Sequence, residues 1–201
     1  MADIAVMVSG GGTNLQALID AEKSSKIPHG KIKLVIASND SAYALERAKN
    51  AGIETAVVRR KDFADQEAFD AGIVAMLQEH HIDMVVLAGY LSILGSGVIA
   101  AYRDRIINIH PSLIPSFCGK GFYGLKVHEA ALARGVKVTG ATVHLVNEIP
   151  DGGRILKQKA VEILPDDTPE VLQKRVMEQA EWILLPEAVA ELAEKIDEEK
   201  A

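Results

Sequence analysis

Short apolar runs alternate with helical patterns along the first half of the chain. Mostly apolar runs of this length are typical of strands buried on both faces, and apolar residues spaced three and four apart are typical of helices. The pattern predicts strands at 4–8, 33–37, 55–58, 84–88 and 106–109, and helices at 13–24, 42–51 and 63–80. Strands that alternate with helices form right-handed βαβ units, so we expect a mostly parallel sheet.

The second half of the chain has a different pattern. Residues 138–147 and 155–163 alternate more and run longer, which predicts strands that extend the sheet in mixed orientation. Residues 167–195 are predicted to be helical, with a break near Leu185-Pro186, because proline cannot donate a hydrogen bond inside a helix. The expected fold class is therefore α/β, an open, doubly wound, mostly parallel sheet with a mixed C-terminal part.

Length and composition fit one globular domain over residues 1–201, with 48% hydrophobic and 25% charged residues. No apolar run approaches the roughly 20 residues that span a bilayer, and the N-terminus lacks a signal-peptide pattern. A single cysteine, Cys118, allows no internal disulfide. We therefore expect no membrane partner and a cytoplasmic location. The formal net charge of -6 disfavours a general nucleic-acid binder.

In open α/β sheets ligands bind at the carboxyl ends of the strands, which places residues 10–14, 89–94 and 108–111 together. The first of these segments lies in Ser9-Gly10-Gly11-Gly12-Thr13-Asn14, where a strand gives way to a helix, and a helix N-terminus with glycines before it suits a phosphate. A dinucleotide loop would need glycine where Leu15 stands, and a P-loop would need lysine. NAD and ATP are thus disfavoured. The alternative is a tight turn that needs glycine only for its dihedral angles.

Asn108 and His110 alternate at the end of the fifth predicted strand, so their side chains point the same way. Pro111 ends the strand and favours an extended His110. An amide can stabilise an oxyanion and an imidazole can move a proton at neutral pH, which together suit acyl transfer. The alternative is that both side chains only satisfy loop backbone. No ligand spacing indicates a metal, and no G-x-S-x-G motif indicates a serine hydrolase.

Asp151-Gly152-Gly153 forms a second polar feature after the long predicted strand. Two glycines after an aspartate favour a turn, and the functional alternative is a carboxylate placed to bias a histidine.

Four segments in this order resemble the phosphoribosylglycinamide formyltransferase family, folate-dependent enzymes of purine synthesis. They are 8–16, 86–94, 107–115 and 142–153, and the resemblance extends over nearly the whole chain. The N-I-H-P-S-L-x-P run is specific to the formyltransferase superfamily, and the S-G-x-G-[ST]-N-L-Q loop narrows it to this branch.

The resemblance implies a role for each matching residue, with 10-formyltetrahydrofolate as co-substrate and no metal. Asn108 would polarise the formyl oxygen, His110 would transfer protons, and Asp151 would favour the charged form of His110. The implied substrate-binding and folate-binding residues are Gly12, Thr13, Asn14 and Glu181 for the ribonucleotide, and Leu91, Ser92, Ile93, Leu94, Asn108 and Gln66 for the folate.

The chain departs from the family pattern in several places. Relatives often carry basic residues where Ser92 and Gln66 stand, and residues 59–61 (Arg-Arg-Lys) could compensate. The glycine-rich segment 117–124 is longer than in many relatives, which predicts a mobile loop, and the spacing from Arg175 to Glu181 is one residue longer.

Three rival functions remain open. A methionyl-tRNA formyltransferase would carry an extra C-terminal domain, and a formyltetrahydrofolate deformylase an N-terminal regulatory domain, for which we expect no room in 201 residues. A non-enzymatic phosphate sensor would leave Asn108, His110 and Asp151 without a purpose. We expect small-molecule substrates, no nucleic acid, and a monomer or homodimer.

Overall fold

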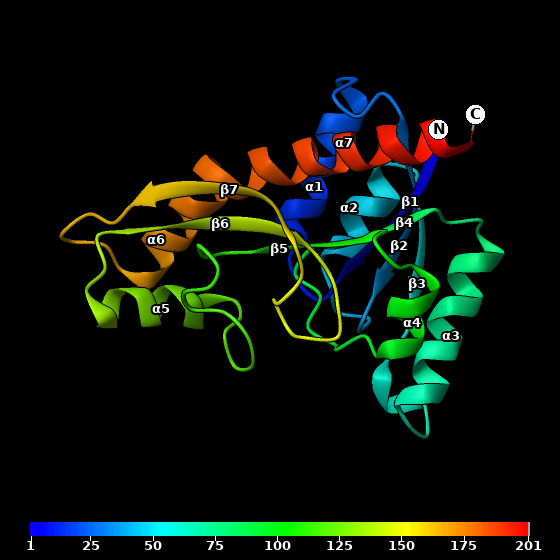
Figure 1. Cartoon of the computed structure of the whole chain (residues 1–201), viewed down its shortest axis with the longest axis horizontal. Coiled ribbons are helices and arrows are strands. Elements are labelled where there is room, and N and C mark those ends of the chain that lie inside the picture. Colours follow the sequence, from blue (N-terminus) through cyan, green and yellow to red (C-terminus); the bar gives the residue numbers. More distant parts are fainter. Residues whose placement is uncertain (201) are drawn as a thin grey trace.

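The computed structural model describes residues 1–200, and its centre is a seven-stranded sheet (Figure 1). The strands are β1 (Ala2–Val8), β2 (Gly30–Ala37), β3 (Glu54–Val57), β4 (Met84–Leu87), β5 (Ile106–His110), β6 (Val138–Leu145) and β7 (Ile155–Glu162). Their order is β3-β2-β1-β4-β5-β6-β7. The first five strands are parallel, while β6 and β7 run antiparallel to their neighbours. The predicted fold class is confirmed, including its mixed C-terminal part.

Helices cover both faces of the sheet (Figure 1). They are α1 (Thr13–Lys23), α2 (Ala44–Asn50), α3 (Gln66–Glu79), α4 (Ser96–Ala101), α5 (Leu125–Arg134), α6 (Pro169–Val176) and α7 (Trp182–Lys200), with a 3-10 turn η1 (Arg60–Asp62) and a π-helical turn η2 (Met177–Glu181). One core cluster joins the sheet to α1, α2 and α7, and a second joins the opposite face to α3 and α4. The chain is therefore doubly wound.

The first strand shows why the runs are apolar throughout. Ile4, Val6 and Val8 pack into the cluster under α1 and α7, and Ala5 and Met7 pack into the cluster under α3. Both sets are fully buried, so alternation of polar and apolar residues is lost.

Two predicted helical boundaries were wrong. The third helix begins at Gln66 rather than at residue 63, because the Asp65 side chain caps it by accepting from the Ala68 amide. The C-terminal helix does not break at Pro186, which lies inside α7. The irregularity is η2, immediately before that helix. Helices α4 and α5 were not predicted; α5 begins after Gly124 and ends at Gly135, whose φ is 76°.

None of the helices within residues 1–200 is both long and apolar enough to cross a membrane.

Candidate functional site

Three loops meet at the carboxyl ends of the central strands. β1 lies between β2 and β4, and β4 pairs with β5, so the segments after β1, β4 and β5 are neighbours. The Ser9 hydroxyl oxygen joins two of them, because it accepts from the Leu91 amide at 2.8 Å. The site thus forms where the strand order reverses, as the sequence predicts.

Asn108 and His110 project from β5 toward the antiparallel strand β6. Asn108 lies opposite His144, and His110 lies opposite Thr142. The Thr142 hydroxyl donates to the Ser112 carbonyl at 2.6 Å and accepts from the Ile114 amide at 3.1 Å, which fixes the turn that follows His110. Cross-strand pairing therefore sets the position of the whole cluster.

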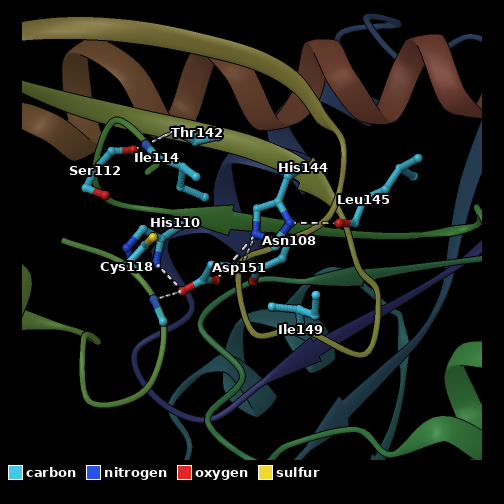
Figure 2. A network of polar contacts seen from close by, with 12 residues as sticks. Asn108, His110, Ser112, Ile114, Cys118, Thr142, His144, Leu145, Ile149 and Asp151 are labelled. Atoms are coloured by element: carbon cyan, nitrogen blue, oxygen red, sulfur yellow. Dashed lines mark hydrogen bonds and ion pairs between the residues drawn. The ribbon is translucent and has the colours of Figure 1, made fainter. Parts of the chain in front are cut away.

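Asp151 lies between two imidazoles (Figure 2). Its carboxylate oxygens are 3.6 Å from His110 Nδ1 and 3.4 Å from His144 Nε2. One of them also accepts from the Gly119 amide at 2.7 Å. The turn requires Gly153, because a Cβ atom there would lie 1.7 Å from the Leu145 carbonyl oxygen. The contact of Asp151 with His110 was predicted from the sequence, whereas the contact of Asp151 with His144 was not.

Neighbouring groups control how the two histidines can hydrogen-bond. His110 Nε2 lies 2.8 Å from the Phe117 carbonyl oxygen, which can only accept, so this nitrogen carries a proton. His144 Nδ1 likewise donates to the Leu145 carbonyl at 2.8 Å. In its neutral form His144 Nε2 accepts from the Asn108 amide, 3.2 Å away. This contact holds the Asn108 side chain in one orientation.

Burial and charge act in opposite directions on this cluster. Burial lowers the pKa of His110 and outweighs the charge of Asp151, which raises it. Burial would raise the pKa of Asp151, but contact with His144, the charge of His110 and the Gly119 amide together lower it. The Asp151 charge acts on His110 in the direction that the sequence predicts, toward the charged form, but burial outweighs it in the net pKa.

A cavity of about 170 Å³ opens beside this cluster. Asn108, His144 and Asp151 form one wall. Ser92, Ile93 and Leu94 from the loop after β4 and residues 146–150 form others. Of the predicted folate-binding residues, Leu91 and Gln66 do not line it. Leu91 is 60% exposed, and Gln66 lies behind the loop, where its amide donates to the Ile93 carbonyl at 3.2 Å.

The glycine loop leaves open space before α1. A Cβ atom at Gly10 or Gly11 would meet nothing within 4 Å, whereas one at Gly12 would meet Ala44 at 2.6 Å. Gly12 has a φ of 70° and caps the helix without a side-chain hydrogen bond. It is therefore needed both for its dihedral angle and for close packing, and the two glycines before it leave room for a ligand at the helix N-terminus.

Asn14 and Glu181 meet in the buried region behind this loop. The Asn14 amide nitrogen lies 2.6 Å from Glu181 Oε2, and its amide oxygen has no partner among the described residues. Burial raises the pKa of Glu181 to about 7, against the Asn14 hydrogen bond, which lowers it. A carboxyl group next to an unpaired amide oxygen can bind hydroxyl groups of a ligand.

The π-helical turn η2 explains how Glu181 reaches this position. An extra residue inside an α-helix rotates the following residues by about 100°. A π-helical turn absorbs one residue. The resemblance to the family predicts one extra residue between Arg175 and Glu181, and η2 occupies residues Met177–Glu181. Glu181 therefore still faces Asn14.

Within residues 1–200, His, Cys, Asp and Glu side chains form no group of three or more that could hold a metal ion. The metal-free site expected from the sequence remains a prediction.

The comparisons with known proteins agree with this geometry. Residues 2–189 match the formyl transferase family. The chain is 44% identical over 179 residues to the phosphoribosylglycinamide formyltransferase of Haemophilus influenzae, covering 89% of this chain and 82% of that protein. The structure of glycinamide ribonucleotide transformylase 1 from Symbiobacterium toebii superimposes with a TM-score of 0.91 at 40% identity, covering 97% and 89%. The chain therefore belongs to the formyl transferase family, and within it to the phosphoribosylglycinamide formyltransferases.

Some relatives are much longer than this chain. It covers 14% of the trifunctional purine biosynthetic protein adenosine-3 of Drosophila melanogaster, at 41% identity. It covers 61% of the chloroplastic phosphoribosylglycinamide formyltransferase of Vigna unguiculata, at 38% identity. In both cases the match extends over at least 94% of the chain studied.

Proposed function

We propose that this chain transfers the formyl group of 10-formyltetrahydrofolate to the amine of 5'-phosphoribosylglycinamide in purine synthesis. The observation that carries the proposal is the cluster of Asn108, His110 and Asp151, of which Asn108 and Asp151 line a cavity. The loop after β4 forms another wall of this cavity and contacts the glycine loop through Ser9. A sensor of phosphate alone would need the loop but not the cluster.

The two substrates approach the cluster from different sides. The phosphate of the ribonucleotide binds at Gly12, Thr13 and Asn14, where the helix N-terminus offers free amides. Glu181 and the unpaired Asn14 oxygen bind the ribose hydroxyls. The folate enters the cavity lined by residues 92–94, with Leu91 at its rim and Gln66 supporting the loop from behind.

The reaction requires one bond to form, one to break and one proton to move. The substrate amine attacks the formyl carbon, and the Asn108 amide stabilises the negative oxygen that develops. The bond from the formyl carbon to folate N10 then breaks. The proton leaves the attacking nitrogen and reaches N10 through His110, directly or through a water molecule.

Both nitrogens of His110 are engaged in this structure. Nε2 donates to the Phe117 carbonyl and Nδ1 faces Asp151. A proton taken up by His110 goes to Nδ1, where the Asp151 charge stabilises it. Direct contact of Nε2 with a substrate requires the Phe117 carbonyl to move away.

Formyl transfer can be assayed with three acceptors: the glycinamide ribonucleotide, water and a simple amine. We expect loss of the formyl group from the folate only with the ribonucleotide. Loss with water alone would identify a deformylase, and no loss would exclude catalysis of this kind. The monomeric or dimeric state and a cytoplasmic location remain expectations.

A further inference from the structure

A second hollow lies on the outer side of α1, away from the cluster at β5. It is a groove of about 490 Å³ between α1 and the start of α7, which pack side by side (Figure 1). Residues of α1 at three- and four-residue spacing form one wall, and Trp182, Ile183 and Pro186 form the other. The groove is hollow because Ala17 and Ala21 are small. We call it the α1–α7 groove.

The two ends of the groove carry positive charge. Arg47 lies at one end and Lys26 at the other, and neither forms an ion pair with an acidic side chain among residues 1–200. Of the two acids in the lining, Glu187 contacts Lys157 at 3.6 Å, and Asp20 accepts from Gln16. Neither cation thus has an ion-pair partner among the described residues, and a ligand with an apolar body and an anionic group at one end of the groove would supply one.

The indole of Trp182 gives the groove a flat wall. Its Nε1–H is buried and has no acceptor among the described residues, so no hydrogen bond holds the ring in one orientation. A volume near 490 Å³ is typical of sites for small organic molecules. We infer that the α1–α7 groove binds a planar aromatic molecule with one anionic group and thereby regulates the substrate site.

Three contacts connect the groove with the glycine loop. Arg47 Nε donates to the Gly11 carbonyl at 2.8 Å. The hydroxyl of Thr13, which also lines the groove, donates to Met177 in η2 at 3.6 Å. Trp182 directly follows Glu181, the partner of Asn14. A ligand that draws Arg47 toward its anionic group would therefore weaken the hold on Gly11. This regulatory part rests on the proposed function, but binding to the groove does not.

Binding can be tested with a matched pair of dyes. 1-Anilinonaphthalene-8-sulfonate has the required aromatic body and anion, and N-phenyl-1-naphthylamine lacks the sulfonate. Trp182 is the only tryptophan of the chain, so quenching of its emission reports binding. We expect saturable one-site quenching by both dyes, with the sulfonate on the order of fivefold tighter, as for a partly exposed ion pair.

Two variants and one control locate the site. Ala17→Phe fills the groove and should abolish quenching by both dyes, while Ala75→Phe, the same change on the exposed side of α3, should not. Arg47→Gln should weaken only the binding of the sulfonate dye, by about threefold to fivefold. Circular dichroism checks that each variant is folded. Equal quenching in the folded Ala17→Phe variant and the Ala75→Phe control would place the dyes elsewhere and overturn the proposal.

The regulatory part is tested by turnover. We expect the sulfonate to raise KM for the ribonucleotide severalfold without a matching loss of kcat, and Ala17→Phe to abolish the effect. An unchanged KM at saturating sulfonate would overturn regulation. If no formyl transfer is found at all, the proposed function fails, while the dye titrations still decide whether the groove binds.

Discussion

Two carboxyl groups, the half-buried Asp151 and the buried Glu181, occupy opposite sides of the candidate site and have opposite electrostatic surroundings. Asp151 has two imidazoles and a backbone amide as neighbours, and these lower its pKa despite burial. Glu181 has one neutral amide, and burial raises its pKa to about 7. More partners and lesser burial together keep the Asp151 carboxyl group ionised, whereas Glu181 has one neutral partner and is fully buried.

The supports of the two regions differ as well. Asn108, His110 and His144 lie on two paired strands, where backbone hydrogen bonds fix the position of each side chain. Glu181 lies in a π-helical turn, and its partner Asn14 lies in the first turn of a helix. A site held by a sheet suits the reacting atoms, and a site between helix ends suits the binding of a polar group.

The largest expected effect comes from the side held by the sheet. Asn108→Ala removes the proposed oxyanion donor, and we expect kcat to fall at least 100-fold, within the range of about 10²–10³ for one such donor. The Asn108 side chain is half-buried and its removal leaves β5 paired, so the fold should persist. Steady-state kinetics and circular dichroism check this. Near-normal turnover in the folded variant would remove Asn108 from the mechanism.

Glu181→Gln tests the region formed by the helix ends. It should remove the titration that distinguishes Glu181 from Asp151. The pKa of Glu181 is raised to about 7 in the folded chain from its ordinary value of 4.5. The folded state therefore binds more protons than the unfolded state between these values, and stability falls as pH rises from about 4.5 to 7. At about 1.4 kcal/mol for each pH unit, the loss over this range is roughly 3 to 4 kcal/mol.

Glutamine keeps an acceptor for Asn14 and does not titrate. Urea unfolding of both proteins at pH 5 and pH 8 should show the variant gaining up to about 3 kcal/mol relative to the parent at the higher pH. If the difference between the two proteins is the same at both pH values, Glu181 does not titrate in this range.

Asp151→Asn tests whether the charge of Asp151 acts on His110 as proposed. The Asp151 charge raises the pKa of His110 against burial, so its removal should lower that pKa further. If neutral His110 accepts the proton, kcat/KM falls where His110 becomes charged. The acidic limb of the profile of kcat/KM against pH should then move to lower pH in the variant. The maximum of kcat/KM should also be lower. A shift of the acidic limb to higher pH would contradict the proposed contact between Asp151 and His110.

His144→Gln should have the smallest effect. Its contact with Asn108 is one hydrogen bond at 3.2 Å, worth about 1 kcal/mol. Complete loss of this bond corresponds to about fivefold in kcat, and His144→Gln, which keeps an acceptor, should lose no more than this. A purely structural role would lower stability without this change in kcat, so denaturant unfolding serves as the control. His144→Phe, which lacks any acceptor, should lose more than His144→Gln.

Much of the fold could be predicted from the apolar runs, because strands buried on both faces carry a strong signal. The boundary errors have local causes. The Asp65 cap moved the start of α3, and Pro186 is tolerated inside α7. The π-helical turn could not be predicted from periodicity, since one extra residue changes the pattern only slightly.

The candidate site was predicted in part. Asn108, His110 and Asp151 lie together as expected, and Gly12, Thr13 and Asn14 open α1. His144 was missed because its pairing with Asn108 depends on the register of β6. The effect of Asp151 on the pKa of His110 was predicted in direction, but the larger opposing effect of burial could not be predicted from the sequence. The roles of all these residues remain predictions until the variants are measured.

The π-helical turn also bears on how this chain could vary in length. Because η2 confines the extra residue to Met177–Glu181, the apolar face of α7, with Leu185, Ala188 and Val189, keeps its register against the sheet. An extra residue absorbed in η2 thus leaves the register of α7 unchanged. Evolution could lengthen or shorten this helix by one residue, and so adjust how far the Glu181 carboxyl group reaches, without redesigning the remaining chain.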